Sequence, residues 1–443
     1  MEVKRNELLN KLIAAKGNDF VKILTGIRRC GKSYLLFKLF KRHLLESDTP
    51  EDHIIEINLE DRANQSLRTP NALGDYIDNR LKRDGRRNFV LIDEIQYCHR
   101  EWNPSIDPAR IPPEEREWAY ITFYDILNHL RSTPDVDVYV TGSNSRLLAS
   151  DVATEFRGRG QIIHVTPLSF AEYNQLAHQC ANPFATLNDY LIYGGLPECA
   201  LKQTDIEKKD YLANLYRTIY LRDIMERYGI QNTELMEYVA NFVLSSISSP
   251  TNPNKLANAI KTVAGIPANQ PTVARMISHL EDSFIISKVQ RYDVRGRHYL
   301  DFPVKYYATD TGLRNAAVNF RQVELTHLME NAIYCELIRR ETAVDVGIID
   351  MRRSNNGEQV RSQHEIDFVV NQGSSRIYIQ SAYMIPDAEK RAQETFSLRH
   401  TGDSFKKIVI TNDPLQSRNY DDDGIFYMGL LDFLTNPKAL ESF

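Results

Sequence analysis

The glycine-rich segment at residues 26–33, GIRRCGKS, constrains the fold of this chain more than any other feature. An apolar run at 20–24 precedes it, and apolar residues at helical spacing follow it from 34 to 40. The two glycines permit a tight turn whose backbone N–H groups face inward, next to the positive end of the following helix. The segment therefore predicts a strand, a phosphate-binding loop and a helix, in that order.

The residues of this loop have distinct expected roles in binding ATP with Mg²⁺. The ammonium of Lys32 is expected to reach the β- and γ-phosphates, and the hydroxyl of Ser33 is expected to bind Mg²⁺. The other positions predicted to surround the phosphates are Gly26, Ile27, Arg28, Arg29, Cys30, Gly31 and Tyr34. A chance glycine-rich turn is the alternative, and the flanking strand and helix patterns disfavour it.

A second apolar run, at residues 88–92, ends in two acidic residues. Such a run is typical of a buried parallel strand that presents carboxylates at its C-terminal end. We expect Asp93 to complete the Mg²⁺ shell and Glu94 to act as the general base for the attacking water. The alternative is a strand followed by an Asp that only caps a helix. The presence of a phosphate-binding loop in the same chain disfavours this alternative.

A further predicted strand, at residues 136–141, leads into the polar segment TGSNS at 141–145. A polar side chain there can contact the γ-phosphate, so we predict this sensor role for Thr141 and Ser143. Beyond this strand, Arg159 is predicted to enter the active site of a neighbouring subunit as an arginine finger, with an exposed surface arginine as the alternative. A finger of this kind requires a homo-oligomer, and a hexamer is one size that we consider.

The order of patterns predicts an α/β chain of four domains. They are a P-loop ATPase core with a parallel sheet at 1–167, a helical lid at 168–229, a winged helix at 230–315 and a nuclease-like α/β domain at 316–443. A polar, proline-bearing segment at 103–113 is predicted to be a surface insertion.

The winged-helix prediction rests on three helical patterns between 234 and 281, followed by two alternating strands. Five basic residues concentrate near the predicted wing: Lys288 and the four expected DNA contacts Arg291, Arg295, Arg297 and Lys305. They predict a surface that contacts DNA phosphates independently of base sequence. The alternative is that this domain packs against other domains and binds no DNA.

The last domain has the order of a restriction-endonuclease-like fold, which needs a helix Glu, a strand Asp and then Glu-x-Lys. The helix offers Glu330 or Glu336, and the first of the two strands offers Asp367. The Glu-x-Lys positions are occupied by Gln380 and Ala382. The domain is therefore predicted to have a nuclease shape without nuclease chemistry.

Composition excludes several classes of protein. The net charge of −5 gives no general attraction to nucleic acid, so DNA contact must come from a local basic surface. The five cysteines form no C-x-x-C pair, which argues against a zinc site and a disulfide framework. No apolar run approaches the roughly 20 residues that span a bilayer, so we expect no membrane association and a cytoplasmic protein.

Several motifs together resemble a bacterial and archaeal family of AAA-type ATPases with a C-terminal nuclease-like domain. They are the loop at 26–33, IDEIQ at 92–96, TGSNS at 141–145, GR at 158–159 and PLSFAEY at 167–173. The resemblance covers nearly the whole chain. It implies a sheet in which the sensor strand lies between the strand of the phosphate-binding loop and the strand with the two acids.

The sequence thus predicts a cytoplasmic ATPase that binds and remodels duplex or branched DNA, with a Holliday junction as one candidate. The second hypothesis is a nucleotide-dependent switch whose C-terminal domains bind a protein partner. An active nuclease is disfavoured by Gln380 and Ala382.

Overall fold

The computed structural model describes residues 3–107, 112–142, 155–156, 158–176, 182–321, 323–355, 358–373 and 375–441. Ser143 lies outside the described residues. The chain forms two compact units, Lys4–Val165 and Thr166–Phe443, and the short segment Met1–Val3 belongs with the second. Among the described residues, no helix combines the length and apolar character needed to cross a membrane.

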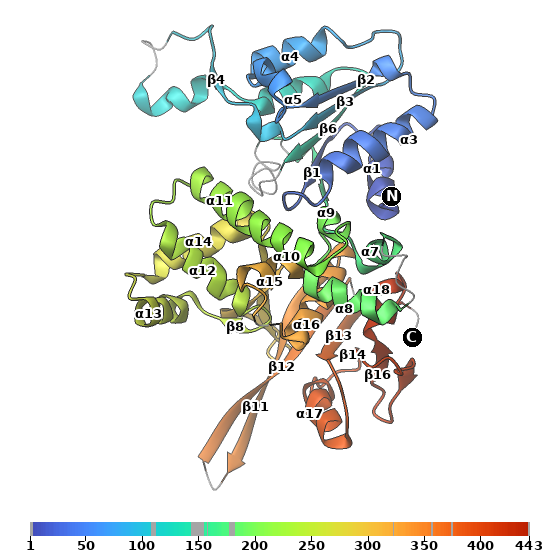
Figure 1. Cartoon of the computed structure of the whole chain (residues 1–443), viewed down its shortest axis with the longest axis vertical. Coiled ribbons are helices and arrows are strands. Elements are labelled where there is room, and N and C mark those ends of the chain that lie inside the picture. The colour runs from blue at the N-terminus through green and yellow to red at the C-terminus, as the bar shows by residue number, and fades with distance from the viewer. Residues whose placement is uncertain are drawn as a thin grey trace. The chain divides into compact units, whose positions relative to one another are not determined.

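The first unit contains a sheet of five parallel strands in the order β2-β3-β6-β1-β7 (Figure 1). The strands are β1 (Val21–Thr25), β2 (Ile54–Asn58), β3 (Asn88–Asp93), β6 (Val136–Gly142) and β7 (Gly160–His164). Every position of β1 and β3 is buried, as the continuous apolar runs predict. Strand β6 lies between β3 and β1, so the implied position of the sensor strand is confirmed.

Helices cover this sheet because its side chains alternate between two apolar faces. Valine and isoleucine side chains of β1, β2, β3 and β6 pack with leucines of α4 (Pro70–Asp78) and α5 (Phe123–Ser132). Tyr139 points to the opposite face, where its ring lies 4.5 Å from that of Phe40. Phe40 ends a π-helical turn (Leu35–Phe40), which continues α2 (Lys32–Tyr34) into α3 (Lys41–Glu46). The predicted insertion lies between the paired strands β4 (Glu101–Trp102) and β5 (Tyr120–Ile121).

The second unit begins with helices. They are α7 (Phe170–Leu176), α8 (Pro183–Tyr193), α9 (Pro197–Ala200), α10 (Asp205–Asn214), α11 (Arg222–Arg227), α12 (Thr233–Ser245), α13 (Pro253–Ala264) and α14 (Gln270–Asp282). An antiparallel hairpin of β9 (Ile286–Asp293) and β10 (His298–Ala308) follows α14, and the short strand β8 (Pro250–Thr251) pairs with β10. Helix α15 (Thr311–Ala317) comes next.

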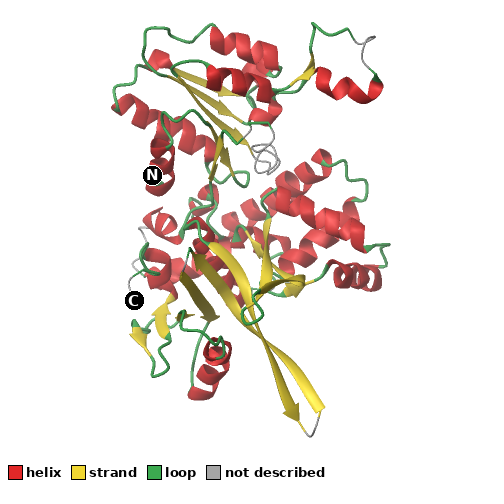
Figure 2. Ribbon diagram, turned by 180° about the vertical axis from the view of Figure 1, so that it is seen from behind, coloured by secondary structure: helices red, strands yellow, loops and turns green. Residues whose placement is uncertain are grey.

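The hairpin belongs to a sheet of nine strands, in the order β15-β16-β14-β13-β12-β11-β9-β10-β8. Figure 2 draws the strands of the protein in yellow. Its remaining elements are α16 (Leu325–Arg339), β11 (Ala343–Asn355), β12 (Glu358–Gln372), β13 (Ser375–Ala382), α17 (Ala388–Arg399), β14 (Lys406–Thr411), β15 (Asn419–Tyr420), β16 (Phe426–Gly429) and α18 (Leu430–Thr435). Strands β9 and β11 pair in parallel at Gly347, where an added Cβ would lie 2.8 Å from the side chain of Val369. The hairpin and the C-terminal strands therefore share one sheet.

Candidate functional site

The loop between β1 and α2 has backbone conformations that depend on its glycines. Gly26 has a φ of 142°, and an added Cβ would lie 2.1 Å from the carbonyl oxygen of Val165. Gly31 has a φ of 100° directly before α2. Arg29 also adopts a positive φ, of 65°. These conformations are the ones that turn consecutive N–H groups toward a bound anion.

Lys32 lies inside this loop, with 4% of its surface exposed. Its ammonium donates to the carbonyl oxygens of Gly26 at 2.9 Å and Ile27 at 3.2 Å. Hydrogen bonds to neutral carbonyls are weaker than those to charged phosphate oxygens. A bound phosphate can therefore exchange with these partners.

The other predicted loop residues divide into buried and exposed side chains. Ile27 and Cys30 are fully buried, so their side chains are not available to phosphates, and the N–H of Cys30 donates to the carbonyl oxygen of Ile27 at 3.4 Å. Ser33 and Arg29 are exposed, and Tyr34 is half-buried. Arg28 forms an ion pair with Glu60 at 2.7 Å.

The two acids at the end of β3 are held by Thr141 on the neighbouring strand β6. The Thr141 hydroxyl donates to Oδ1 of Asp93 and accepts the backbone N–H of Glu94 at 2.9 Å. Glu94 has a φ of 54°, which turns the chain sharply after the strand. Thr141 is fully buried and thus positions both acids, while its predicted contact with the γ-phosphate stays a prediction.

Glu94 has the environment of a general base. Its side chain is 6% exposed, and Gln96 donates to its Oε2. Burial raises the pKa of Glu94; the positive charge of Lys32 opposes this shift and the negative charge of Asp93 adds to it. A carboxylate whose pKa is raised toward neutrality accepts a proton more readily from water.

Two residues near the loop were not predicted. Arg5 is 2% exposed and donates from Nη1 to the carbonyl oxygen of Cys30 at 2.8 Å, which fixes the loop backbone. His164 ends β7, and burial together with the charges of Lys32 and Lys11 lowers its pKa to about 4. No local pattern marks either residue, because both come close to the loop only when segments distant in sequence are folded together.

Arg159 lies directly before β7. Its backbone carbonyl accepts the N–H of Val21 at 3.1 Å, and its side chain is exposed. An exposed side chain fits either a finger or a surface arginine, so the role of Arg159 stays a prediction.

Two of the four basic residues predicted to contact DNA are buried, and that part of the prediction is wrong. Lys305 is 1% exposed, and its ammonium lies 2.9 Å from Glu330 and 2.6 Å from Glu365. Arg291 is 7% exposed and donates to Gln363 at 3.3 Å. Both lie on strands that continue from the hairpin into the nine-stranded sheet, so inward-facing positions are buried even when they carry charge.

The acids of the predicted nuclease-like site surround Lys305. Asp367 lies 3.8 Å from the ammonium and accepts the N–H of Ser381 at 2.8 Å. Tyr307 donates to Glu330 at 2.7 Å. Burial and the neighbouring charge of Glu330 raise the pKa of Asp367 well above its ordinary value. Three carboxyl groups thus share one ammonium, and we call Lys305, Glu330, Glu365 and Asp367 the Lys305 cluster.

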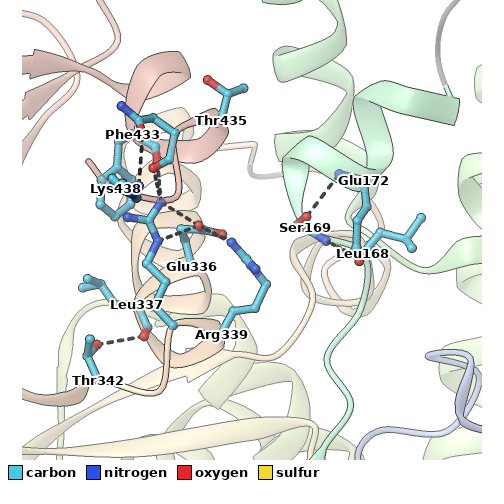
Figure 3. A network of polar contacts seen from close by, with 12 residues as sticks. Leu168, Ser169, Glu172, Glu336, Leu337, Arg339, Thr342, Phe433, Thr435 and Lys438 are labelled. Carbon is cyan, nitrogen blue, oxygen red and sulfur yellow. Dashed lines mark hydrogen bonds and ion pairs between the residues drawn. The ribbon is translucent and has the colours of Figure 1, made fainter. Parts of the chain in front are cut away.

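Glu336, the other acid considered on α16, has a different role. It accepts from Arg339 at 2.6 Å and from Arg340 at 2.8 Å, and Arg340 also donates to the carbonyl oxygen of Phe433 (Figure 3). Glu336 therefore holds Arg340, which joins the end of α16 to α18, and Glu330 is the helix acid next to Asp367. Among the described residues, no group of three or more His, Cys, Asp or Glu side chains is arranged to hold a metal ion.

Comparisons with known proteins agree with the geometry of the first unit. Residues 18–174 match the family described as an AAA domain, and residues 185–324 match a domain of unknown function (DUF8612). An uncharacterized protein of Haemophilus influenzae is 29% identical over 429 residues, which are 96% of this chain and 97% of that protein.

Two further similarities extend over most of the chain. The uncharacterized protein MJ1544 of Methanocaldococcus jannaschii is 23% identical, over 95% of this chain and 87% of that protein. The solved Walker-type ATPase of Pyrococcus abyssi has 14% identity and a TM-score of 0.49, over 72% of this chain and 96% of that chain. The AAA match, the loop geometry and the two acids beside Lys32 together show that the protein is an ATPase with a P-loop domain of the AAA type.

Proposed function

We propose that the protein couples Mg²⁺-dependent ATP hydrolysis to the binding and remodelling of DNA. The observation that carries the hydrolytic part is the network in which Thr141 holds Asp93 and Glu94 close to Lys32. The DNA-binding part rests on the exposed arginines at the β9–β10 turn.

The proposed chemistry assigns one role to each group at the site. Lys32 exchanges its carbonyl partners for the β- and γ-phosphate oxygens. Glu94 accepts a proton from water while the water oxygen attacks the γ-phosphorus and the bond to the ADP oxygen breaks. Burial of Glu94 favours this proton transfer because it raises the pKa of the accepting carboxylate.

Mg²⁺ fits the donor atoms that Ser33 and Asp93 offer. The Ser33 hydroxyl is exposed at the start of α2, and Asp93 carries a carboxylate that Thr141 orients. Mg²⁺ prefers such oxygen donors and shields the charge of the phosphates when bound. Ser33 and Asp93 would hold the ion.

We further propose that the active enzyme is a homo-oligomer in which Arg159 enters a neighbouring subunit. Arg159→Ala and Glu94→Gln proteins should each be nearly inactive, and mixing them should restore turnover at interfaces where each supplies what the other lacks. A protein that stays monomeric with ATP and hydrolyses it at the full rate would remove this role.

The proposed DNA-binding part is a winged helix formed by α12, α13, α14 and the β9–β10 hairpin. Arg295 and Arg297 lie in the turn of this hairpin and are exposed, so they can contact phosphates. The chain order supports this proposal, because the three helices precede the hairpin as in known winged helices.

The C-terminal elements support a nuclease-like domain that has lost cleavage. A helix, three antiparallel strands, a second helix and a fourth strand follow one another as α16, β11, β12, β13, α17 and β14. Glu330 and Asp367 are the acids that would bind a metal in such a domain, but the Lys305 ammonium lies 2.9 Å from Glu330 and 3.8 Å from Asp367. With Gln380 and Ala382 in place of the remaining pair, we propose that this domain binds DNA without cutting it.

The experiment that tests the proposal is ATP turnover measured without DNA and with single-stranded, duplex and four-way junction DNA. We expect DNA to stimulate turnover in the native protein, with Lys32→Ala as the inactive control. If ATP turnover is the same with each of the three DNA forms as without DNA, and no DNA binding is measurable, the proposed DNA binding and remodelling is overturned. The nucleotide-dependent switch would then be favoured.

A further inference from the structure

A cavity of about 550 Å³ lies where the β9–β10 turn meets the start of β13 and the loop after α17. Its walls include Arg295, Arg297, Arg376, Tyr292, Phe405 and Thr401. This volume lies in the range of ligand pockets in proteins. Neither nucleotide hydrolysis nor the Lys305 cluster uses this cavity.

The walls are fixed by contacts between segments that are distant in sequence. Nε of Arg295 donates to the carbonyl oxygen of His400 at 2.9 Å, which joins the turn to the end of α17. The N–H of Val294 donates to the carbonyl oxygen of Ile348 at 3.0 Å, which joins the turn to β11. The cavity is therefore part of the folded sheet and is preformed.

Aromatic rings and a guanidinium plane line one side of the cavity. The guanidinium carbon of Arg376 lies 5.0 Å from the ring centre of Tyr292 and 5.6 Å from that of Phe405. Tyr299 packs edge-on against Tyr292 at 5.3 Å and is 53% exposed, and Phe405 is 37% exposed. Exposed aromatic faces beside arginine are the surfaces on which unpaired nucleobases stack.

The nearby carboxylates are already bound to local donors. Asp403 accepts from Tyr378 at 2.6 Å and from the N–H of Phe405 at 3.3 Å. Asp293 accepts the N–H groups of Arg295 and Gly296, at 3.0 and 2.8 Å. In the described part of the chain, no ion pair joins Arg295, Arg297 or Arg376 to a carboxylate. Arg376 donates through Nε to Asn371 at 3.2 Å and through Nη1 to Tyr378 at 3.4 Å. The guanidinium groups of Arg295 and Arg297 therefore keep the donors for an external anion.

A buried hydroxyl provides a second, independent indication of a ligand. Thr401 lines the cavity and is 4% exposed, and its Oγ1 has no hydrogen-bond partner among the described residues. Buried polar atoms are nearly always satisfied by a partner. A ligand with a polar group in the cavity would supply one.

We propose that this cavity binds a nucleotide of unpaired DNA, with its phosphate at Arg295 and Arg297 and its base against Arg376 and Phe405. The bases of a duplex are stacked inside the helix and do not reach a concave pocket, so the nucleotide must be unpaired. This inference rests on the proposed DNA binding and names single-stranded DNA as the form that is recognised.

The test compares binding of a fluorescent oligo(dT) strand and of a blunt duplex to the full-length protein, by anisotropy. Arg376→Ala and Phe405→Leu should each weaken binding of the single strand about tenfold, since stacking contributes strongly for each base. Neither change should alter duplex binding or ATP turnover without DNA. Thr401→Val, which removes the hydroxyl and keeps the shape, should weaken binding of the single strand by a smaller factor.

Arg222→Ala is the matched control, because Arg222 is exposed on α11 and its ion pair is with Glu226. It removes the same charge and should leave both affinities unchanged. Unchanged single-strand affinity in Arg376→Ala and Phe405→Leu would overturn the inference about the cavity. Binding of the duplex would in that case still support the proposal that the protein binds DNA. If the native protein binds no form of DNA, the inference about the cavity and the proposed DNA binding both fail. Competition by inorganic phosphate as strong as that by oligo(dT) would also overturn it.

Discussion

The phosphate-binding loop and the Lys305 cluster each place a buried lysine beside acidic residues, but they differ in what the lysine contacts. Lys32 donates to two neutral carbonyl oxygens, and Glu94 acts on it through charge at longer range. Lys305 contacts the carboxylates themselves. Carbonyl partners can be exchanged for phosphate, whereas removing an ammonium from a buried carboxylate leaves an uncompensated charge. The first arrangement is open to a ligand and the second is closed by its own cation.

The largest expected effect is on ATP turnover and concerns the phosphate-binding loop. Lys32→Ala should abolish ATP turnover by removing the phosphate contact. Glu94→Gln should still bind ATP but hydrolyse it at least about 100-fold more slowly, because the amide cannot accept the proton. Turnover and nucleotide affinity measured on both variants check this. Near-native turnover of Glu94→Gln would remove Glu94 from the role of base.

The pH dependence of turnover tests the same residue. Burial raises the pKa of Glu94, so its carboxyl group should remain protonated at pH values where an exposed glutamate is already ionised. Turnover should therefore fall as the pH drops through this raised pKa, which places the acidic limb of the pH profile above the ordinary range of a glutamate. A limb that persists in the slow Glu94→Gln protein would belong to another group.

The next effect is on protein stability and concerns the Lys305 cluster. Lys305→Met should lower the free energy of unfolding by about 3–5 kcal/mol, since it leaves buried carboxylates uncompensated. The acids should then bind a divalent ion, so Mn²⁺ should raise the thermal stability of the variant and leave the native protein unchanged. Chemical unfolding and melting curves with and without Mn²⁺ measure both effects.

Lys261→Met is the control for this variant, because Lys261 is exposed on α13. Its stability should stay near that of the native protein, with or without Mn²⁺. The native protein should also fail to cleave linear, supercoiled or junction DNA with Mg²⁺ or Mn²⁺. Cleavage that disappears in Asp367→Ala would show that the cluster is not closed.

A smaller effect is expected from the residue that positions the two acids. Thr141→Val keeps the shape of the side chain but removes the hydroxyl that joins Asp93 to the N–H of Glu94. Turnover should fall about tenfold, since a lost buried hydrogen bond costs about 1–3 kcal/mol. Thr141→Ser should restore it. Equal turnover in the Val and Ser variants would show that the hydroxyl is not needed.

The smallest effect concerns the exposed turn. Replacing Arg295 and Arg297 with alanine should weaken duplex binding for all base sequences and reduce the salt dependence by about one unit of slope for each lost phosphate contact. Turnover without DNA should not change. Unchanged duplex affinity would mean that these elements pack against other parts of the protein and do not bind DNA.

The comparison also separates what local sequence predicts well from what it does not. The spacing of 26–33 and the run at 88–92 predicted the strand, the loop and the two acids, because each depends on neighbouring residues. The order β3-β6-β1 followed from the family resemblance. The prediction for Lys305 and Arg291 was wrong because a count of basic residues near the turn treats each one as exposed. Both lie instead at inward positions of a sheet built by distant strands.

The sequence by itself determined the phosphate-binding loop, the two acids that follow the apolar run at 88–92 and the replacement of the Glu-x-Lys pair by Gln380 and Ala382. Each is defined within a few residues of chain, where covalent connection fixes the geometry. Tertiary structure alone decided that Thr141 braces the acids, that Glu330 and not Glu336 lies next to Asp367, and that Lys305 is enclosed by carboxylates. These pairings depend on which strands become neighbours, and burial of the whole apolar surface determines that choice.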